Sequence, residues 1–329
     1  MTQQIVANRT GMLFLAPMEG LVDALMRDLI TSVGGVDVCV TEFLRISDQR
    51  LPDKVFKRLC PEAESGWKTP AGTPVVLQLL GSNPELMAES AVQGVQLGAP
   101  AIDINFGCPA KTVNKNRGGS VLLQEPEIVY AIVKAMRDAV PSDIPVTAKM
   151  RLGYQDASLA LENAQAVEAG GAAQLVIHAR TKVEGYKPPA HWHALAPLRE
   201  KLSIPVVANG EIWTLEDYIR CREISGCEDI MLGRGLVSKP WLCEEIKAWQ
   251  RQEVWQDNAP AIMAKLLDKF IKEVQAANIP RYAMGRAKQW LKMIREAHPL
   301  LNENVESWMR IKDPEALFSA IHRTTDGWR

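Results

Sequence analysis

The feature that most constrains the fold is a series of eight apolar, β-rich runs that recur at a regular interval. Each run is apolar along its length rather than alternating in polarity, which is typical of parallel strands buried on both faces. Most of the intervals carry helical patterns, with apolar residues three and four positions apart. The eight runs are Met12–Met18, Val36–Phe43, Pro74–Gly81, Pro100–Gly107, Ile144–Gly153, Ala172–Thr181, Ile204–Trp213 and Glu228–Gly235.

This alternation of strands and helices predicts an α/β fold whose eight strands close into a (β/α)8 TIM barrel. After the eighth run the strand rhythm stops, and from residue 261 the pattern is helical throughout. We therefore predict a flexible N-terminal extension at residues 1–11, a barrel at 12–245, a linker at 246–260 and a small all-helical domain at 261–329.

Composition excludes several classes of protein. At 329 residues and 47% hydrophobic content the chain can bury a large core, and its net charge of −1 excludes a surface that is basic all over. No apolar run approaches the roughly 20 residues of a membrane span, and the first residues lack the apolar core of a signal peptide. We expect a cytoplasmic monomer that binds neither a membrane nor a metal, because the six cysteines form no Cys-x-x-Cys pair or His/Cys cluster.

Reacting groups in such barrels lie at the carboxyl ends of the strands. The last two predicted strands end in Gly-rich turns, Ala208–Ile212 and Leu232–Gly235, each leading toward a helix. Backbone N–H groups at such turns would form a phosphate site. Alternatively, these glycines only permit tight turns.

Three polar residues stand within or at the end of apolar strands. Lys149 is costly to bury unless it is paired, so we interpret it as a cation that faces a ligand that becomes anionic, such as a reduced flavin. Gln78 and His178 could bond the edge of the same ring. The alternatives are a lysine that reaches the solvent, a glutamine that caps its strand and a histidine satisfied within the core.

Several stretches together resemble the tRNA-dihydrouridine synthases, and most closely the synthase C group within them. The most specific is "DINFGCPAKTVNKNRGGS", which joins Asn-x-Gly-Cys-Pro to Lys-x-x-x-Asn and a Gly-Gly turn. Similarity extends over nearly the whole chain; about ten extra residues before Met12 are the one departure. The other matching stretches are "APMEG", "TEFLRISDQRLP", "QLLGS", "KMRLG", "VIHARTK", "ANGEIW", "MLGRG" and "AKQWL".

The resemblance implies an FMN-binding barrel with a C-terminal helical domain that recognises tRNA. It implies reduction of one uracil C5=C6 bond in the D-loop, at position 16, at the expense of NADPH. The residues that it assigns to FMN are Pro17, Met18, Glu19, Gln78, Lys149, His178, Asn209, Gly210, Glu211, Gly233 and Arg234.

The resemblance also assigns Cys108 the role of proton donor, and thiol chemistry suits that role. Reduction of uracil needs a hydride at C6 and a proton at C5 from the opposite side of the base. A thiol with an unperturbed pKa near 8.5 is mostly protonated at neutral pH and can still give its proton to a developing enolate. Alternatively, Cys108 is a small buried hydrophobe.

A base must leave its stack before a flavin can lie against it, and a tRNA loop offers such bases. Lys288, Lys292 and Arg295 are spaced so that they share one helix face, which is either an RNA contact or an ordinary solvated face. The tRNA contacts that we predict are Arg45, Asn105, Arg151, Arg281, Arg286, Lys288, Lys292 and Arg295.

Two other functions remain open from the sequence. One is an FMN barrel that acts on a free small molecule, and the other is a tRNA-binding protein without enzymatic activity. No Gly-x-Gly-x-x-Gly motif follows a strand, so we expect NADPH to reduce FMN at the face that the uridine later occupies.

Overall fold

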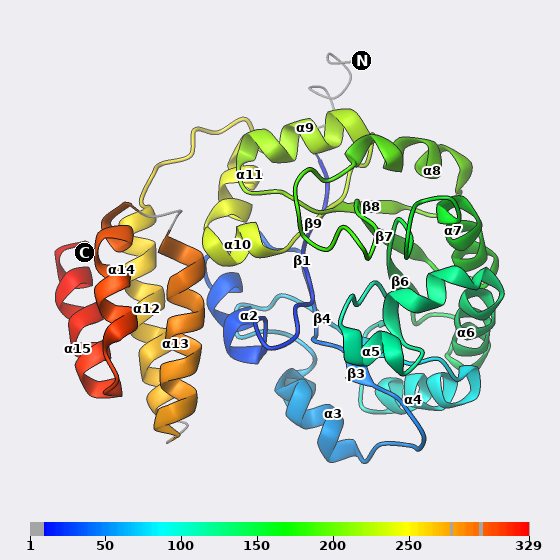
Figure 1. Ribbon diagram of the computed structural model, residues 1–329, viewed down its shortest axis with the longest axis horizontal. Helices are drawn as coiled ribbons and strands as arrows, with labels where there is room; N and C mark the ends of the chain where they lie inside the picture. Colours follow the sequence, from blue (N-terminus) through cyan, green and yellow to red (C-terminus); the bar gives the residue numbers. More distant parts are fainter. Residues whose placement is uncertain (1–9, 277–278, 296–298, 329) are drawn as a thin grey trace.

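The computed structural model describes residues 10–276, 279–295 and 299–328. Eight parallel strands form a closed barrel, in which β2 pairs with both β1 and β4 and so joins the two ends of the sheet (Figure 1). Each predicted run contains one of these strands, so the predicted (β/α)8 barrel is confirmed. The strands are β1 (Leu13–Leu15), β2 (Val38–Val40), β4 (Val75–Leu80), β5 (Ile102–Phe106), β6 (Val146–Arg151), β7 (Gln174–His178), β8 (Val206–Asn209) and β9 (Ile230–Leu232).

Helices cover the outside of the barrel, and local signals fix their ends. Pro84 begins α4, whose N-cap Asn83 accepts two backbone N–H bonds, and Thr214 forms a capping box with Asp217 at the start of α9. The helices of this layer are α2 (Ala24–Thr31), α4 (Pro84–Gln96), α5 (Lys111–Lys115), α6 (Pro126–Ala139), α7 (Ala160–Ala169), α8 (Leu195–Lys201), α9 (Leu215–Ser225), α10 (Arg234–Ser238) and α11 (Leu242–Gln250). Short 3₁₀ helices lie at η2 (Gly119–Gln124) and η3 (Trp192–Ala194).

The inside of the barrel carries an apolar cluster and a separate group of polar side chains. Alternate residues of β1, β7, β8 and β9, such as Phe14, Val176, Val207 and Met231, form an apolar cluster separate from the main core. Side chains alternate between the two faces of a strand, so every second residue points into the barrel. Further along the same strands, and on the other strands, these inward positions are polar. Register pairs of this kind are Gln78 with Asp103, Asn105 with Lys149, Arg151 with His178, and His178 with Asn209.

The segment between β2 and β4 carries three short elements that the sequence pattern did not resolve. They are β3 (Leu44–Arg45), which extends the sheet by pairing Leu44 with Leu79, then α3 (Asp53–Leu59) and η1 (Pro61–Ser65). A two-residue strand has no periodicity to detect, since its apolar content is one residue.

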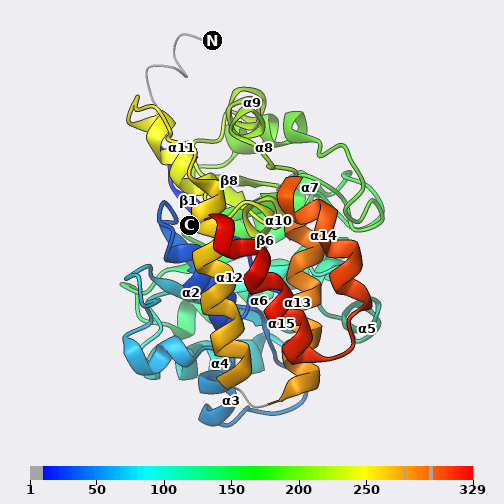
Figure 2. The same cartoon turned by 90° about the vertical axis from the view of Figure 1, so that its left-hand side faces the viewer.

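The C-terminal helices pack together against one side of the barrel (Figure 2). Rings of Phe270 and Trp290 lie 5.1 Å apart between α12 and α13, and the Trp290 indole N–H donates to the Val237 carbonyl of α10 at 3.1 Å. The elements are α12 (Ala259–Ala276), α13 (Pro280–Ile294), α14 (Pro299–Arg310), α15 (Pro314–Thr325) and η5 (Asp326–Trp328).

Two of the predicted boundaries can be compared with observed elements of the structure. Residues 246–250, assigned to the linker from sequence, belong to α11, and this assignment was wrong because Ile246 and Ala248 pack into the core and continue the helix. Residues 1–9 of the expected extension lie outside the described residues, while the Gly11 carbonyl accepts bonds from Lys247 and Gln250. The division into domains stays a prediction.

The described ranges contain neither a membrane-spanning helix nor a metal-binding cluster. None of the helices there is both long and apolar enough to cross a membrane. No group of three or more His, Cys, Asp or Glu side chains in those ranges could hold a metal ion.

Candidate active site

The carboxyl ends of the barrel strands surround a cavity of about 490 Å³. This is where the fold places reacting groups. Most of the residues predicted for a cofactor or substrate line it: Pro17, Met18, Glu19, Asn105, Cys108, Lys149, Arg151, His178, Asn209, Gly210, Glu211, Gly233 and Arg234.

The loop that carries Cys108 is held through its backbone. The Asn105 side-chain oxygen accepts the N–H groups of Gly107 and Cys108, both at 2.9 Å. The Cys108 carbonyl accepts bonds from Asn114 Nδ2 and Ser120 Oγ, both at 2.9 Å. These contacts, together with the bond from the Ala110 N–H to the sulfur, fix the position of the thiol.

Close approach of a neighbouring turn also limits the Cys108 loop. Gly119 adopts φ +65°, and a Cβ there would lie 2.9 Å from the Cys108 Cβ and 2.8 Å from its carbonyl oxygen. Only glycine fits this position, since a side chain would push the loop away. The Gly-Gly turn of the sequence motif is therefore a packing requirement of the cysteine loop.

Burial keeps the Cys108 thiol protonated. Burial raises its pKa above the ordinary value, and the nearby Glu19 carboxylate adds to this effect, while the Ala110 N–H, Arg151 and Arg45 act in the other direction. The side chain is nevertheless part of the cavity wall. A neutral thiol at the edge of a cavity is suited to donating a proton and unsuited to acting as a thiolate nucleophile.

Gln78 lies deeper in the barrel than predicted and is not among the residues that line the cavity. Its amide donates to Asp103 at 2.7 Å and accepts from Asn105 at 2.8 Å, and Asp103 accepts from Thr147 at 2.6 Å. This buried network orients Asn105 and, through it, the Cys108 loop. A contact between Gln78 and a cofactor stays a prediction.

Lys149 is the cation at the base of the cavity. Its ammonium donates to Asn209 Oδ1 at 3.0 Å, and Asn209 in turn donates to the Met231 carbonyl at 2.8 Å. Burial lowers the Lys149 pKa to about 8, helped by the Arg151 charge and opposed by Asp103. The ammonium is thus poorly compensated by the protein, as expected for a group that awaits an anionic partner.

His178 presents a neutral ring to the same space. Burial lowers its pKa well below the ordinary value, and the charges of Arg151, Lys149 and neighbouring arginines lower it further. In the described part of the protein its buried Nδ1 has no hydrogen-bond partner. Gly210, at φ +119°, approaches the ring so closely that a Cβ there would lie 3.3 Å from Nε2.

The turns after β8 and β9 form the cationic end of the cavity. Glu211 stands at φ +61° and pairs with Arg180, whose buried Nη1 has no hydrogen-bond partner among the described residues. A Cβ at Gly233 would make only ordinary van der Waals contacts, with Met18 Sδ at 3.7 Å and the Ala16 Cβ at 3.8 Å. Arg234 follows immediately and lies over the rings of Tyr186 and Trp213.

Sequence reasoning missed several residues of the cavity wall. Phe43, Tyr186 and Trp213 lie on loops; Phe43 and Trp213 appeared in the sequence only as the last residues of two apolar runs, and Tyr186 lies between runs. Gln289 comes from α13. Gln289 donates to the Gly20 carbonyl at 2.9 Å, so the helical domain directly completes the site. The "AKQWL" stretch and the spacing of Lys288, Lys292 and Arg295 marked that helix, but neither singled out Gln289.

The residues predicted to contact tRNA lie in different settings. Arg151 is buried and donates to the carbonyls of Gly107, Thr181 and Gly185, so it braces the cysteine loop. Arg45 lies in β3, half-buried and outside the cavity lining.

The predicted cationic face of α13 is only partly presented to solvent. Arg286 pairs with Asp23 at 2.8 Å and bonds the Gly20 and Leu21 carbonyls, while Lys288 donates to the Met309 and Ile311 carbonyls. Lys292 is exposed and Arg295 is half-buried. The Arg281 side chain lies outside the described residues. Their roles in tRNA binding stay predictions.

Comparison with known proteins agrees with this geometry. The family model described as dihydrouridine synthase matches residues 14–316. A tRNA-dihydrouridine(16) synthase of Aquipseudomonas alcaligenes is 52% identical over 312 residues, covering 95% of each chain. One of Pseudomonas putida is 56% identical over 285 residues, covering 87% of this chain and 88% of the relative.

Solved structures show the same fold at low sequence identity. A 2-naphthoyl-CoA reductase complex has a TM-score of 0.57 at 12% identity, covering 75% of this chain and 51% of that one. Histamine dehydrogenase from Rhizobium sp. 4-9 has a TM-score of 0.55 at 15% identity, covering 78% and 48%. The family model and the relatives that match most of the chain confirm the predicted family: this chain belongs to the dihydrouridine synthase family.

Proposed function

We propose that this chain reduces the C5=C6 bond of a uridine in tRNA to 5,6-dihydrouridine, using bound FMN, NADPH as the reductant and Cys108 as the proton donor. The observation that carries the proposal is a protonated, backbone-anchored thiol in the same cavity as a buried, uncompensated lysine. Family membership supports a flavin and a tRNA substrate.

The cavity fits a flavin phosphate and ring system. The Gly233 position leaves space that a Cβ would fill, and the unpartnered Nη1 of Arg180 together with Arg234 offers cationic donors for a phosphate. Lys149, His178 and Asn209 would hold the ring, where the unpartnered His178 Nδ1 and the poorly compensated ammonium are both suited to bonding a polar ring edge. A bound reduced flavin supplies the hydride for C6, and NADPH restores its reduced form.

The residues of this chain then supply the proton and hold the proton donor in place. Cys108 gives the proton to C5, the Cys108 sulfur becomes a thiolate, and solvent returns the proton after the product leaves. Asn105, bonded to Gln78 and to the loop N–H groups, keeps the thiol at a fixed position relative to the base. Arg151 holds the Gly107 carbonyl and prevents the loop from moving outward.

Substrate choice is the finer part of the proposal. The relatives named above are tRNA-dihydrouridine(16) synthases, so we propose that the uridine is the one at position 16. The predicted contacts on α13, together with Arg45 and Asn105, would bind the tRNA around it. We further propose a cytoplasmic monomer.

The test uses purified protein, NADPH and an unmodified tRNA transcript that contains the D-loop uridines. Nucleoside mass spectrometry should find dihydrouridine in the product, with NADPH consumed in equal amount and a flavin absorption spectrum in the protein. If the protein carries flavin and oxidises NADPH but leaves tRNA unchanged, a free small molecule becomes the substrate class. A protein that binds tRNA without flavin would be a non-enzymatic RNA-binding protein.

A further inference from the structure

A second cavity lies beside the active site and has no role in the reaction as described. It occupies about 460 Å³ between α2, the β2–β3 connection, α3 and α13. Phe43 lines both cavities and so forms a shared wall. A chain-like substrate that places one of its groups in the active site therefore has room for the adjacent group immediately beyond Phe43.

The walls of this second cavity combine aromatic rings, a cation and carboxylates. Tyr282 of α13 is 42% exposed, and its hydroxyl donates to Asp23 Oδ2 at 3.5 Å. Glu42 accepts the Gly20 N–H. Arg58 is exposed, and no ion pair or hydrogen bond engages its guanidinium in the described ranges.

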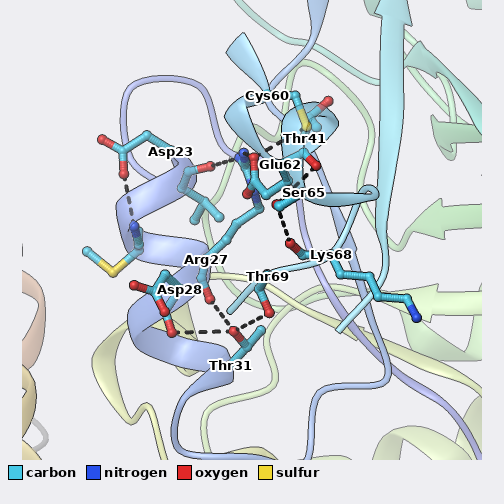
Figure 3. Close-up of polar contacts among 12 residues, drawn as sticks. Asp23, Arg27, Asp28, Thr31, Thr41, Cys60, Glu62, Ser65, Lys68 and Thr69 are labelled. Carbon is cyan, nitrogen blue, oxygen red and sulfur yellow. Dashed lines mark hydrogen bonds and ion pairs between the residues drawn. The ribbon is translucent and has the colours of Figure 1, made fainter. Parts of the chain in front are cut away.

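Buried contacts fix α2, which forms one wall of the second cavity, to the segment that follows α3. Arg27 of α2 makes two bonds to the buried Glu62 carboxylate, at 2.7 and 2.8 Å, and one to the Val22 carbonyl (Figure 3). Thr31 and Thr69 also bond side chain to side chain at 2.9 Å (Figure 3). These contacts lock the segment after α3 onto α2, and Figure 1 shows α2 on the side of the barrel that faces the helical domain.

The chemistry of the occupant follows from the proposed reaction. Extruding a uridine from a folded loop leaves its neighbour in the chain without a stacking partner. Proteins bind such bases by stacking them on aromatic rings, with cations at the phosphates and polar groups at the base edges. Phe43, Tyr282, Arg58 and Glu42 supply these elements within one cavity.

We propose that the second cavity binds the unpaired nucleobase adjacent to the target uridine, stacked on Tyr282 and Phe43, with Glu42 accepting from its N–H edge and Arg58 at its phosphate. This inference rests on the proposed function, since it needs a tRNA substrate. It adds a site that reads a position beside the reduced one. The helical domain then contributes to both cavities, through Gln289 in the first and Tyr282 in the second.

The experiment is a double-mutant cycle between protein and RNA. Affinity of the flavin-loaded protein is measured for an intact tRNA transcript and for transcripts with an abasic residue on the 5′ or the 3′ side of the target. We expect one abasic substitution, and Tyr282→Ala, each to weaken binding by at least about fivefold, with the two together no weaker than either alone. If the loss of affinity from Tyr282→Ala and the loss from the abasic residue multiply on both the 5′ and the 3′ side of the target, the inference is overturned.

Two control variants exclude a merely structural effect. Tyr282→Phe keeps the ring and should bind like the wild type; if it binds as weakly as Tyr282→Ala, the hydroxyl matters and stacking is contradicted. Tyr130→Ala removes a tyrosine of equal exposure, 41% against 42%, on α6 outside both cavities, and should leave affinity unchanged. Reduction of the intact transcript by the wild type is measured in parallel, so that failure of the proposed function is seen separately.

Discussion

At the scale of single residues, the site separates positioning from chemistry. Cys108 is held by its own backbone groups, whereas its sulfur is left to react. Lys149 shows the opposite arrangement, because its charge has one neutral hydrogen-bond partner, Asn209, and no bonded carboxylate among the described contacts. A ligand in the cavity explains both the accessible sulfur of Cys108 and the buried charge of Lys149.

Replacing Cys108 with alanine should remove the proton donor and little else. We expect uridine reduction to fall by about 10²- to 10⁴-fold, while flavin content and NADPH oxidation stay at the wild-type level. Because burial raises the thiol pKa above the ordinary value of a free cysteine, the loss of the wild-type rate through loss of this proton should be centred at a higher pH than for a free cysteine, in a series from pH 7 to pH 10. Single-turnover rates measured across this range check both statements, and a decline centred near neutral pH would contradict the second.

Replacing Lys149 with methionine should stabilise the flavin-free protein while weakening flavin retention. The folded pKa of about 8 lies below the unfolded value of 10.5, so burying the charge costs up to about 3 kcal/mol below pH 8. That cost declines between pH 8 and 10.5, because over this range the folded state has lost the proton and the unfolded state has not.

The measurement is the free energy of unfolding of the flavin-free proteins at several pH values. The advantage of Lys149→Met over the wild type should be greatest at neutral pH and shrink as the pH approaches 10.5. An advantage that is independent of pH, or a destabilised variant that still retains flavin, would show that Lys149 is not an uncompensated cation.

At the scale of elements, the Arg27–Glu62 ion pair connects α2 to η1, in the segment between β2 and β4. A buried pair of this kind contributes little compared with apolar residues, but removal of one partner leaves an isolated charge. Cys60 Sγ also lies 3.3 Å from the Glu62 carboxylate, so the whole cluster depends on Arg27.

Replacing Arg27 with methionine should therefore destabilise the protein by about 3–5 kcal/mol, as judged by urea unfolding. The double variant Arg27→Met with Glu62→Leu should recover most of that loss, because no charge then stays buried alone. Equal losses in the single and double variants would mean that the pair itself, rather than the unpaired carboxylate, determines stability.

How much of these elements the sequence predicts depends on their length and periodicity. The eight barrel strands are continuous apolar runs between helical patterns, and the strand ends bring Cys108, Lys149 and His178 to one cavity as expected. β3 is too short to show a period, and the depth of a glutamine within a barrel is invisible to spacing, so the sequence did not reveal the bonds of Gln78 with Asp103 and Asn105. Tyr186 and Gln289 reach the cavity only through tertiary packing.

At the scale of the whole molecule, the site is shared between the barrel and the C-terminal helices, which contribute Gln289 of α13. The β1–α2 loop lies between them, and the Gly20 carbonyl accepts bonds from both Arg286 and Gln289 of α13. Arg286 was predicted from sequence as a tRNA contact, and the structure shows it 7% exposed and paired with Asp23. Its intramolecular contacts make domain docking a testable alternative to RNA binding.

Replacing Arg286 with alanine should lower the stability of the protein in the absence of tRNA, by about 1–3 kcal/mol, because Asp23 loses its cationic partner, the Leu21 carbonyl loses its bond from Arg286, and the Gly20 carbonyl keeps only Gln289. Arg286→Lys should not restore it, since one ammonium cannot reach these acceptors together. The melting temperature of the tRNA-free protein decides the point. An unchanged melting temperature combined with weaker tRNA binding would assign Arg286 to the RNA instead.

The measurement that tests the central claim most directly is dihydrouridine mapping of tRNA from cells that lack this gene, complemented with the wild type or with Cys108→Ala. We predict that dihydrouridine is missing at position 16 alone, and that the wild type restores it while Cys108→Ala does not. Dihydrouridine present at every position in the deletion strain would contradict the tRNA substrate, and restoration by Cys108→Ala would contradict the role of the thiol.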